Sequence, residues 1–178
     1  MEKSVITLAG VKHCGKSTLG RLAAERCGFA FFDADAELER LHDKGTRELF
    51  RELGEEQFRR MESEVLSLIS GYPGHKVISL GGGAVTNSFV TPETWNALHP
   101  LVMIDIPEET ACERVFANGV PAYLEKYSDP VAALRDINSE RRAQMKKKCD
   151  AIYNAAPELS PEDQAERFIE FLEKEGIL

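Results

Sequence analysis

Residues 10–18 read GVKHCGKST and match the pattern G-x-x-x-x-G-K-[ST], which constrains the fold more than any other stretch of the sequence. The apolar run VITLA at 5–9 precedes the match, and the helix-like segment KSTLGRLAAERC at 16–27 follows it. In this strand–loop–helix order, successive loop N–H groups and the N-terminus of the helix attract an anion. We therefore predict a phosphate-binding loop between a first strand and a first helix.

The residues between the two glycines of this loop are all larger than glycine. We expect their side chains to point outward, because the N–H donors exist whatever the side chains are. Lys12 and His13 could add positive charge, but the simpler interpretation is that they are surface residues, with Cys14 an inert loop residue. Lys16 is expected to reach the β- and γ-phosphates of ATP, and Ser17 to ligate Mg²⁺. The predicted ATP-binding residues of the loop are Gly10, Val11, Lys12, His13, Cys14, Gly15, Lys16, Ser17 and Thr18.

Short apolar runs alternate with helix-like segments along the rest of the chain. The expected strands are 5–9, 29–33, 76–80, 101–106 and 151–155, and their near-continuous apolar character is typical of strands covered on both faces. The expected helices are 16–27, 35–43, 46–53, 55–70, 92–98, 108–117, 131–148 and one from about 161 to 176. This alternation predicts an α/β fold with one domain over 1–178, in which helices cover both faces of a five-stranded parallel sheet.

Bulk composition argues against several classes of protein. The chain has 178 residues, and its net charge of -8 argues against a general nucleic-acid surface. No apolar run approaches the ~20 residues that span a membrane, and the first strand begins too early to leave room for a signal peptide. The four cysteines are scattered without metal-site spacing, which fits reduced thiols. We expect a cytoplasmic protein that binds neither nucleic acid nor membrane.

Two carboxylates lie at the end of the second expected strand, and a triple glycine follows the third. Asp33 and Asp35 lie in FFDADAELE at 31–39, and GGG at 81–83 follows VISL at 77–80. Ligands of open parallel sheets bind at the carboxyl ends of the strands. One carboxylate there could hold Mg²⁺ through water, and the other could accept a proton from an attacking hydroxyl. The alternative is that one of them only caps the following helix.

Four motifs together resemble those of the shikimate kinase family. They are the phosphate-binding loop, D-x-D at 33–35, G-E-x-x-F-R-x-x-E at 54–62 and L-G-G-G-A-V at 80–85, and the resemblance covers roughly the whole chain. It implies a P-loop NTPase fold like that of nucleoside monophosphate kinases, with mobile substrate-binding helices at about 35–62 and a lid at about 116–130. It also implies an enzyme that uses ATP and Mg²⁺ to phosphorylate the 3-hydroxyl of shikimate, in the pathway to chorismate and the aromatic amino acids. We expect a monomer, although the sequence itself does not report the oligomeric state.

The resemblance implies roles for individual residues. Asp35 matches the base that also holds ring hydroxyls of shikimate, and it would act in catalysis with Lys16. Asp33 matches part of the magnesium shell, together with Ser17, while Ser79 could bind a water of that shell.

The matching substrate-binding residues are Asp35, Arg59, Gly81, Gly82, Gly83 and Arg141, with Arg142 as a close alternative to Arg141. The arginine that stacks on adenine matches Arg114, although a solvent-facing helix arginine is nearly as good an interpretation. Arg59 could instead pair with Glu55, one turn earlier.

The lid departs from the family pattern. The family has an arginine where this chain has Val120, followed by the matching Pro121. Loss of a transition-state arginine can cost about 10³-fold or more in phosphoryl transfer. Lys126 or Lys12 could substitute, turnover could be slow, or the protein could bind shikimate or nucleotide without catalysis. A gluconate-type sugar-acid kinase is a further alternative, since it shares the phosphate-binding loop.

Overall fold

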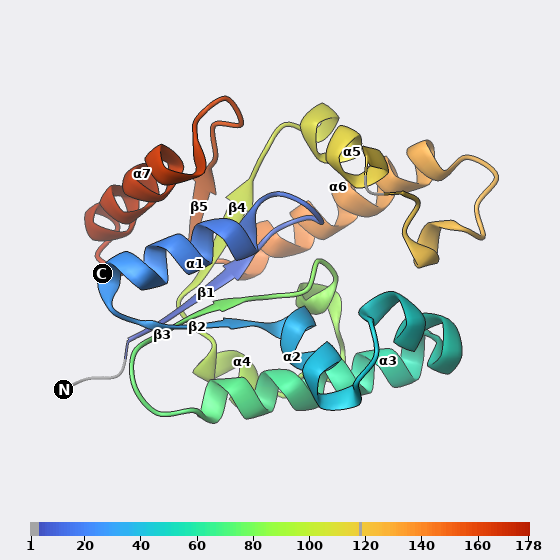
Figure 1. Cartoon of the computed structure of the whole chain (residues 1–178), viewed down its shortest axis with the longest axis horizontal. Helices are drawn as coiled ribbons and strands as arrows, with labels where there is room; N and C mark the ends of the chain where they lie inside the picture. Colours follow the sequence, from blue (N-terminus) through green and yellow to red (C-terminus); the bar gives the residue numbers. More distant parts are fainter. Residues whose placement is uncertain (1–3, 118) are drawn as a thin grey trace.

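Five parallel strands form one sheet in the order β2-β3-β1-β4-β5 (Figure 1). The computed structural model describes residues 4–117 and 119–178, so Asn118 of the predicted lid and residues 1–3 of the predicted domain lie outside the described part. The strand bounds are β1 Val5–Ala9, β2 Ala30–Asp33, β3 Lys76–Ser79, β4 Leu101–Asp105 and β5 Ala151–Asn154. The predicted five-stranded parallel sheet is confirmed.

The position of a strand in the sheet decides how far it is buried. All residues of β1 and β3 are buried, as are the first four of β4. The edge strands differ, because β2 has no fully buried residue and β5 has only Tyr153. The expectation of strands covered on both faces is correct for the three central strands. It holds only in part at the edges: Phe31 and Phe32 of β2 pack against the clusters on opposite faces but are only half-buried, and in β5 only Tyr153 is buried.

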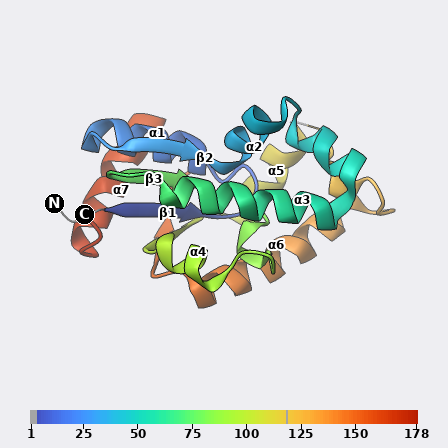
Figure 2. The same cartoon turned by 90° about the horizontal axis from the view of Figure 1, so that it is seen from below.

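Helices cover both faces of the sheet (Figure 2). On one face α1 and α7 pack together, and Leu19 and Phe168 join Ile104 in one apolar cluster. On the other face α3 and α6 contribute Leu66 and Met145 to a second cluster. In the described part of the chain, no helix is both long and apolar enough to cross a membrane. The helix bounds are α1 Lys16–Cys27, α2 Ala34–His42, α3 Thr46–Gly71, α4 Pro92–Ala97, α5 Glu108–Ala117, α6 Pro130–Lys148 and α7 Pro161–Lys174, with 3₁₀ turns η1 Ala84–Thr86 and η2 Ala122–Leu124.

A glycine divides α3 into two arms. Gly54 has φ 78° and ψ 172°, a conformation that glycine adopts far more readily than other residues. The two predicted helices at 46–53 and 55–70 are therefore consecutive arms of one element with a sharp bend between them. Because of the bend, residues of both arms, such as Phe50 and Phe58, line the same cavity beside the sheet.

The segment between α5 and α6 is the predicted lid. It contains η2, and Leu124 of this turn is buried in a third apolar cluster with Val115 and Leu134. Glu125 forms an ion pair with Arg51 of α3 and lies 3.9 Å from Arg47. The lid therefore contacts the first arm of α3 in this structure.

Candidate functional site

The phosphate-binding loop connects β1 to α1 and turns at two glycines. A Cβ atom on Gly10 would lie 2.5 Å from Cys14 Sγ and 2.7 Å from the carbonyl oxygen of Ile104, so a larger residue does not fit there. Gly15 has φ 98° and is the N-cap of α1. The predicted strand–loop–helix arrangement is present, and it places a helix N-terminus at the carboxyl end of β1, where an anion can bind.

The side chains between these glycines divide into two pairs. Val11 and Cys14 are 1% and 3% exposed and pack into the core cluster beside β4. Lys12 is exposed and His13 half-buried, and both line the large cavity described below. The expectation that all four point outward is therefore wrong for Val11 and Cys14, because the loop folds over the end of the sheet and its apolar side chains fill the space beneath it.

Lys16 is buried and satisfied by its own loop. Its Nζ atom donates hydrogen bonds to the carbonyl oxygens of Gly10 and Val11, at 3.0 and 3.1 Å, and contacts Cys14 Sγ at 3.7 Å. Burial of an ammonium group requires such partners. The arrangement holds the charge of Lys16 at the centre of the loop, next to the backbone donors predicted to bind phosphate.

The predicted magnesium residues lie at the ends of neighbouring elements. Asp33 pairs with Ser79 across β2 and β3, and Ser79 Oγ is 3.3 Å from Ser17 Oγ. Asp33 Oδ1 accepts hydrogen bonds from the backbone of Asp35 and Ala36, both at 3.1 Å, and thereby caps α2. The capping alternative is correct for this oxygen. No group of three or more acidic, His or Cys side chains arranged for a metal occurs in the described residues. The two serine hydroxyls and the Asp33 carboxylate are oxygen donors at one sheet edge, which fits Mg²⁺ held together with phosphate oxygens and water.

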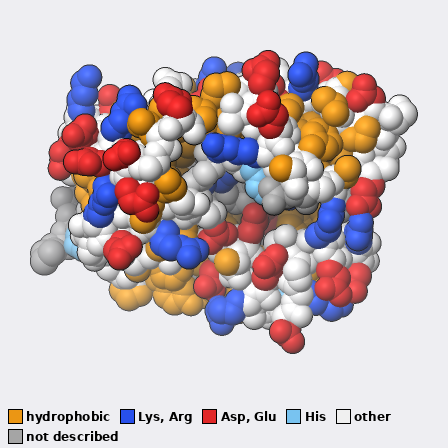
Figure 3. All heavy atoms as spheres, turned by 45° about the horizontal axis from the view of Figure 1, so that its top comes forward, with side chains coloured by type: hydrophobic (Ala, Val, Ile, Leu, Met, Phe, Trp, Pro, Cys, Tyr) orange, Lys and Arg blue, Asp and Glu red, His pale blue; other side chains and the backbone are white. Residues whose placement is uncertain are grey.

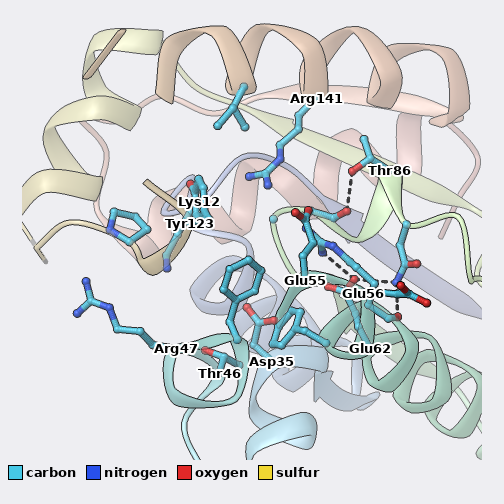
Figure 4. Close-up of a pocket in the computed structure, with 18 of the residues that line it drawn as sticks. Lys12, Asp35, Thr46, Arg47, Glu55, Glu56, Glu62, Thr86, Tyr123 and Arg141 are labelled. Carbon is cyan, nitrogen blue, oxygen red and sulfur yellow. Dashed lines mark hydrogen bonds and ion pairs between the residues drawn. The ribbon is translucent and has the colours of Figure 1, made fainter. Parts of the chain in front are cut away.

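A cavity of about 850 Å³ opens next to the loop (Figure 4). Its walls come from the loop, α2, both arms of α3, η1, the lid and α6. Of the predicted substrate residues, Asp35, Arg59, Gly82, Gly83 and Arg141 line it. Gly81 is buried just behind, where an added Cβ would lie 2.7 Å from Asp35 Oδ1 and 2.8 Å from Glu62 Oε1. The structure thus brings together residues that are more than 100 positions apart in the sequence.

A buried ion pair orients Arg59. Its Nη1 atom lies 2.9 Å from Oε2 of Glu62, a residue that is 4% exposed. Asn87 Nδ2 donates to the same carboxylate oxygen at 2.9 Å and to the Arg59 carbonyl at 2.7 Å. Gly83 leaves room for the guanidinium, because a Cβ there would lie 2.4 Å from Arg59 Nη2. In the described part of the chain Arg59 pairs with Glu62 and not with Glu55, so the alternative pairing is wrong.

Glu62 and Asn87 hold Arg59 in place, although the sequence patterns predicted no role for either. Glu62 closes the quoted motif F-R-x-x-E, and its spacing of three residues from Arg59 on a helix is the signal that could have identified the pair. Asn87 follows η1 and gives no comparable signal.

Asp35 lies in a negative environment on the cavity wall. Burial raises the pKa of its carboxyl group to about 6, the negative charges of Glu62 and Asp33 add to the shift, and Lys16 and Lys12 oppose it. A raised pKa makes a carboxylate a stronger base. Asp35 therefore combines accessibility from the cavity with a basicity suited to taking a proton near neutral pH.

The structure distinguishes Arg141 from its neighbour. Arg141 points into the cavity (Figure 4), with its Cζ atom 5.2 Å from the centroid of the Tyr123 ring. Arg142 points elsewhere: its Nε atom lies 3.0 Å from Asp105 Oδ1, and its guanidinium also binds Glu108 and the carbonyl oxygen of Ile106. Only the first of the two alternatives, Arg141, lies where a substrate carboxylate could reach it.

A second, smaller cavity of about 190 Å³ lies on the other side of the loop. It is lined by Gly15 and Thr18 of the loop region, by Arg114 of α5 and by the segment after β5. Arg114 Nη1 donates a hydrogen bond to the His13 carbonyl at 3.3 Å. The predicted nucleotide residues Thr18 and Arg114 therefore share a cavity with the N-terminus of α1, and the solvent-facing alternative for Arg114 does not describe its position.

Val120 and Lys126 occupy different environments within the lid. Val120 packs against the third apolar cluster, formed around Leu124 and Leu134. Lys126 lines the large cavity, but its Nζ atom sits 5.3 Å from the centroid of the Tyr127 ring. Residue 120 thus serves the packing of the lid.

The phosphate-binding loop follows β1 of a parallel sheet, and the large cavity lies beside it at the same sheet edge. This combination defines the class of P-loop kinases that act on small molecules. A sequence model of the family described as shikimate kinase matches residues 12–173. The shikimate kinase of Nostoc punctiforme (strain ATCC 29133 / PCC 73102) is 32% identical over 167 residues, which cover 93% of this chain and 88% of that protein. The chain belongs to the shikimate kinase family.

Two further relatives match over a shorter stretch. The shikimate kinase of Synechococcus sp. (strain CC9605) is 37% identical over 138 residues, 76% of this chain. That of Thermosynechococcus vestitus (strain NIES-2133 / IAM M-273 / BP-1) is 38% identical over 112 residues, 62% of this chain. The chain spans 66% and 58% of the lengths of these two proteins.

Solved structures agree with the family. The shikimate kinase from Acinetobacter baumannii in complex with shikimate gives a TM-score of 0.84 at 25% identity and covers 97% of this chain and 94% of its own. A gluconokinase from Sinorhizobium meliloti 1021 gives a TM-score of 0.59 at 16% identity over 96% of both chains, and this likeness shows the fold alone.

Proposed function

We propose that this chain transfers the γ-phosphoryl group of ATP to the 3-hydroxyl of shikimate. The observation that carries the proposal is the contact between the phosphate-binding loop and the arginine-lined cavity. Lys12 of the loop lines that cavity, and its backbone nitrogen lies 3.4 Å from the place of a Cβ on Gly82. Membership of the family supports the proposal, as does the similarity to a shikimate kinase solved with shikimate.

The acid would be held by two arginines from opposite walls. Arg59 comes from α3 and is fixed by Glu62, whereas Arg141 comes from α6 (Figure 4). Two guanidinium groups converging on one carboxylate give charge-assisted hydrogen bonds with defined geometry. This arrangement favours a carboxylated ring alcohol over a neutral polyol.

Asp35 would accept the proton of the attacking hydroxyl. The hydroxyl oxygen forms a bond to the γ-phosphorus as the bond from that phosphorus to the β–γ bridging oxygen breaks, and ADP leaves. The proton moves to the carboxylate of Asp35, whose raised pKa suits this role. Phosphate-loop donors and Lys16 would stabilise the charge on the phosphates.

Ser17, Asp33 and the hydroxyl of Ser79 would position Mg²⁺. The 3.3 Å approach of the two serine hydroxyls and the location of Asp33 at the same sheet edge support the assignment. When bound, the ion would neutralise negative charge on the β- and γ-phosphates.

A gluconate-type kinase and a binding protein without turnover are the alternatives. ATP consumption should be measured with shikimate and with gluconate, each at saturating Mg²⁺. The proposal predicts rapid ADP formation with shikimate and a background rate with gluconate. The opposite preference would establish the sugar-acid alternative. Tight binding of ATP and shikimate, with no ADP formed at micromolar enzyme, would establish the binding protein.

We further propose that the protein acts as a monomer in the cytoplasm. The cavity and loop are complete within one chain, and all four cysteines are free thiols. On the face shown in Figure 3, acidic and basic side chains are interspersed, as suits a chain with no role in general nucleic-acid binding. Light scattering of the purified protein at micromolar concentration tests the oligomeric state.

A further inference from the structure

We propose that Lys12 is a catalytic residue that contacts the transferring phosphoryl group and neutralises its charge. The inference rests on the proposed function and goes beyond it, because it assigns a second lysine of the loop to the reaction. It is based on which Lys and Arg side chains around the large cavity already pair with a carboxylate and which do not.

Phosphoryl transfer requires fixed positive charge where the two substrates meet. Negative charge spreads over three oxygens of the phosphoryl group in the transition state, so catalysis depends mainly on positioning and on electrostatic stabilisation. The described part of the large cavity is lined by five Lys or Arg side chains, namely Lys12, Arg47, Arg59, Lys126 and Arg141.

Two of these cations already have a carboxylate partner. Arg59 is 2.9 Å from Glu62, and Arg47 is 3.9 Å from Glu125 of the lid. Lys126 lies over the Tyr127 ring. Within residues 4–117 and 119–178, neither Lys12 nor Arg141 forms an ion pair with a carboxylate. Lys126 forms none there either, so Lys12, Lys126 and Arg141 remain as candidates for the two anionic groups that the substrates bring, a carboxylate and a phosphoryl group.

Position decides which cation serves which anion. Arg141 lies on α6, with its guanidinium alongside Tyr123. Lys12 lies in the loop itself, four residues before Lys16. Its backbone nitrogen lies 3.4 Å from the position of a Cβ on Gly82, which also lines the cavity. The phosphoryl group travels from the loop toward Asp35, so Lys12 is the unpaired cation beside its path.

The electrostatic surroundings of Lys12 agree with this position. Partial desolvation by the surrounding cavity wall lowers the pKa of the Lys12 ammonium, Arg47, Arg141 and Lys16 lower it further, and Asp35 acts in the opposite direction. An ammonium surrounded by other cations is stabilised when an anion binds among them. The lid does not supply this charge from residue 120, because Val120 packs into an apolar cluster.

The test compares steady-state kinetics of Lys12→Met, Lys12→Arg, Lys126→Met and Lys146→Met. Methionine keeps the length of the side chain without the charge, and Lys146 is an exposed residue of α6 outside the cavity. We expect kcat to fall about 100-fold in Lys12→Met, as for the loss of one transition-state donor, with KM for shikimate within threefold of the native value. Lys12→Arg should recover to within tenfold of the native kcat, and Lys146→Met should match the native enzyme.

A second readout separates catalysis from ground-state binding. The native protein should bind ADP, Mg²⁺, aluminium fluoride and shikimate together as a mimic of the transition state. Lys12→Met should lose about 100-fold in affinity for this mimic while its affinity for ADP and for shikimate alone is retained. Melting temperatures of all variants establish that they are folded.

Several outcomes would overturn the assignment of Lys12. They are a native kcat in Lys12→Met, a rise in KM for shikimate without loss of kcat, an equal loss in Lys12→Met and Lys12→Arg, or a larger loss in Lys126→Met. If the native protein itself makes no product, the proposed function fails, which is a different result from an active protein that tolerates Lys12→Met.

Discussion

Arg141 and Arg142 are consecutive residues of α6, but their guanidinium groups have different surroundings. Arg142 is held by Asp105 at the end of β4 and by Glu108 at the start of α5. Arg141 faces the large cavity and lies over Tyr123. Arg142 therefore stabilises the packing of α6, whereas Arg141 is available to a ligand.

Substitution of each arginine by alanine should separate the two roles. Arg141→Ala should raise KM for shikimate about 10-fold or more with little change in melting temperature, because it removes a charge-assisted contact to the acid. Arg142→Ala should destabilise the fold by ~2 kcal/mol, because two partly buried carboxylates lose their partner. Steady-state kinetics and thermal unfolding of both variants provide the measurement. A destabilised Arg141→Ala with unchanged KM would contradict the placement of Arg141.

Gly83 should be needed for the position of the Arg59 guanidinium. In Gly83→Ala the new methyl group would meet Arg59 Nη2 at 2.4 Å, and the guanidinium would have to move. We expect KM for shikimate to rise about 10-fold or more, while KM for ATP changes less than threefold. Gly71→Ala is the matched control, since a Cβ there meets no atom within 4 Å. Equal changes in both KM values would indicate a general distortion instead.

Asp35→Asn should abolish turnover while ATP binding persists. The amide keeps the size of the side chain but cannot accept the proton of the hydroxyl, and such a base typically contributes 10²–10⁴-fold to the rate. Single-turnover rates and nucleotide titrations measure the two effects separately. Retention of a tenth or more of the native rate would remove Asp35 from the role of base.

The same substitution should stabilise the protein free of ligands, in a way that depends on pH. The Asp35 pKa is raised from 3.8 to about 6 by folding, so the folded state holds a proton that the unfolded state releases. This group therefore causes stability to fall as pH rises from about 4 to about 6, and the full penalty remains above that range. Because solvent reaches Asp35 from the cavity, we expect an effect of only ~1 kcal/mol.

In metal-free buffer at pH 8, Asp35→Asn should thus melt about 2–4 °C above the native protein, the shift that ~1 kcal/mol produces in a domain of this size. At pH 3.5 the two melting temperatures should coincide. A difference that grows as pH falls would have the wrong sign for a raised pKa.

Much of the fold could be predicted from local sequence patterns. The phosphate-binding loop, the parallel sheet and the break at Gly54 follow from residue spacing and from glycine positions, which depend on neighbours in the sequence. The exposure of β2 and β5 could not be predicted from these patterns, because strand order depends on how distant segments pair. The inward side chains of Val11 and Cys14 could not be predicted for a similar reason: the core that they enter includes residues of β4 and α7, which are distant in the sequence.

The candidate site likewise contains residues that could be predicted from the sequence and residues that could not. Family-like motifs located Asp35, Arg59 and the triple glycine, and the structure gathers them around one cavity. The choice between Arg141 and Arg142 required the structure, since either residue fits the sequence spacing. Asn87 was missed because its hydrogen bond to Glu62 joins segments 25 positions apart.

The identity of the phosphorylated product tests the central claim most directly. The protein should be incubated with Mg²⁺, ATP and shikimate, and the products examined by ³¹P and ¹H NMR. The account predicts one phosphomonoester whose phosphorus couples to the ring proton at carbon 3, formed in equal amount to ADP. Formation of ADP with inorganic phosphate alone, or a phosphomonoester at another ring position, would contradict it.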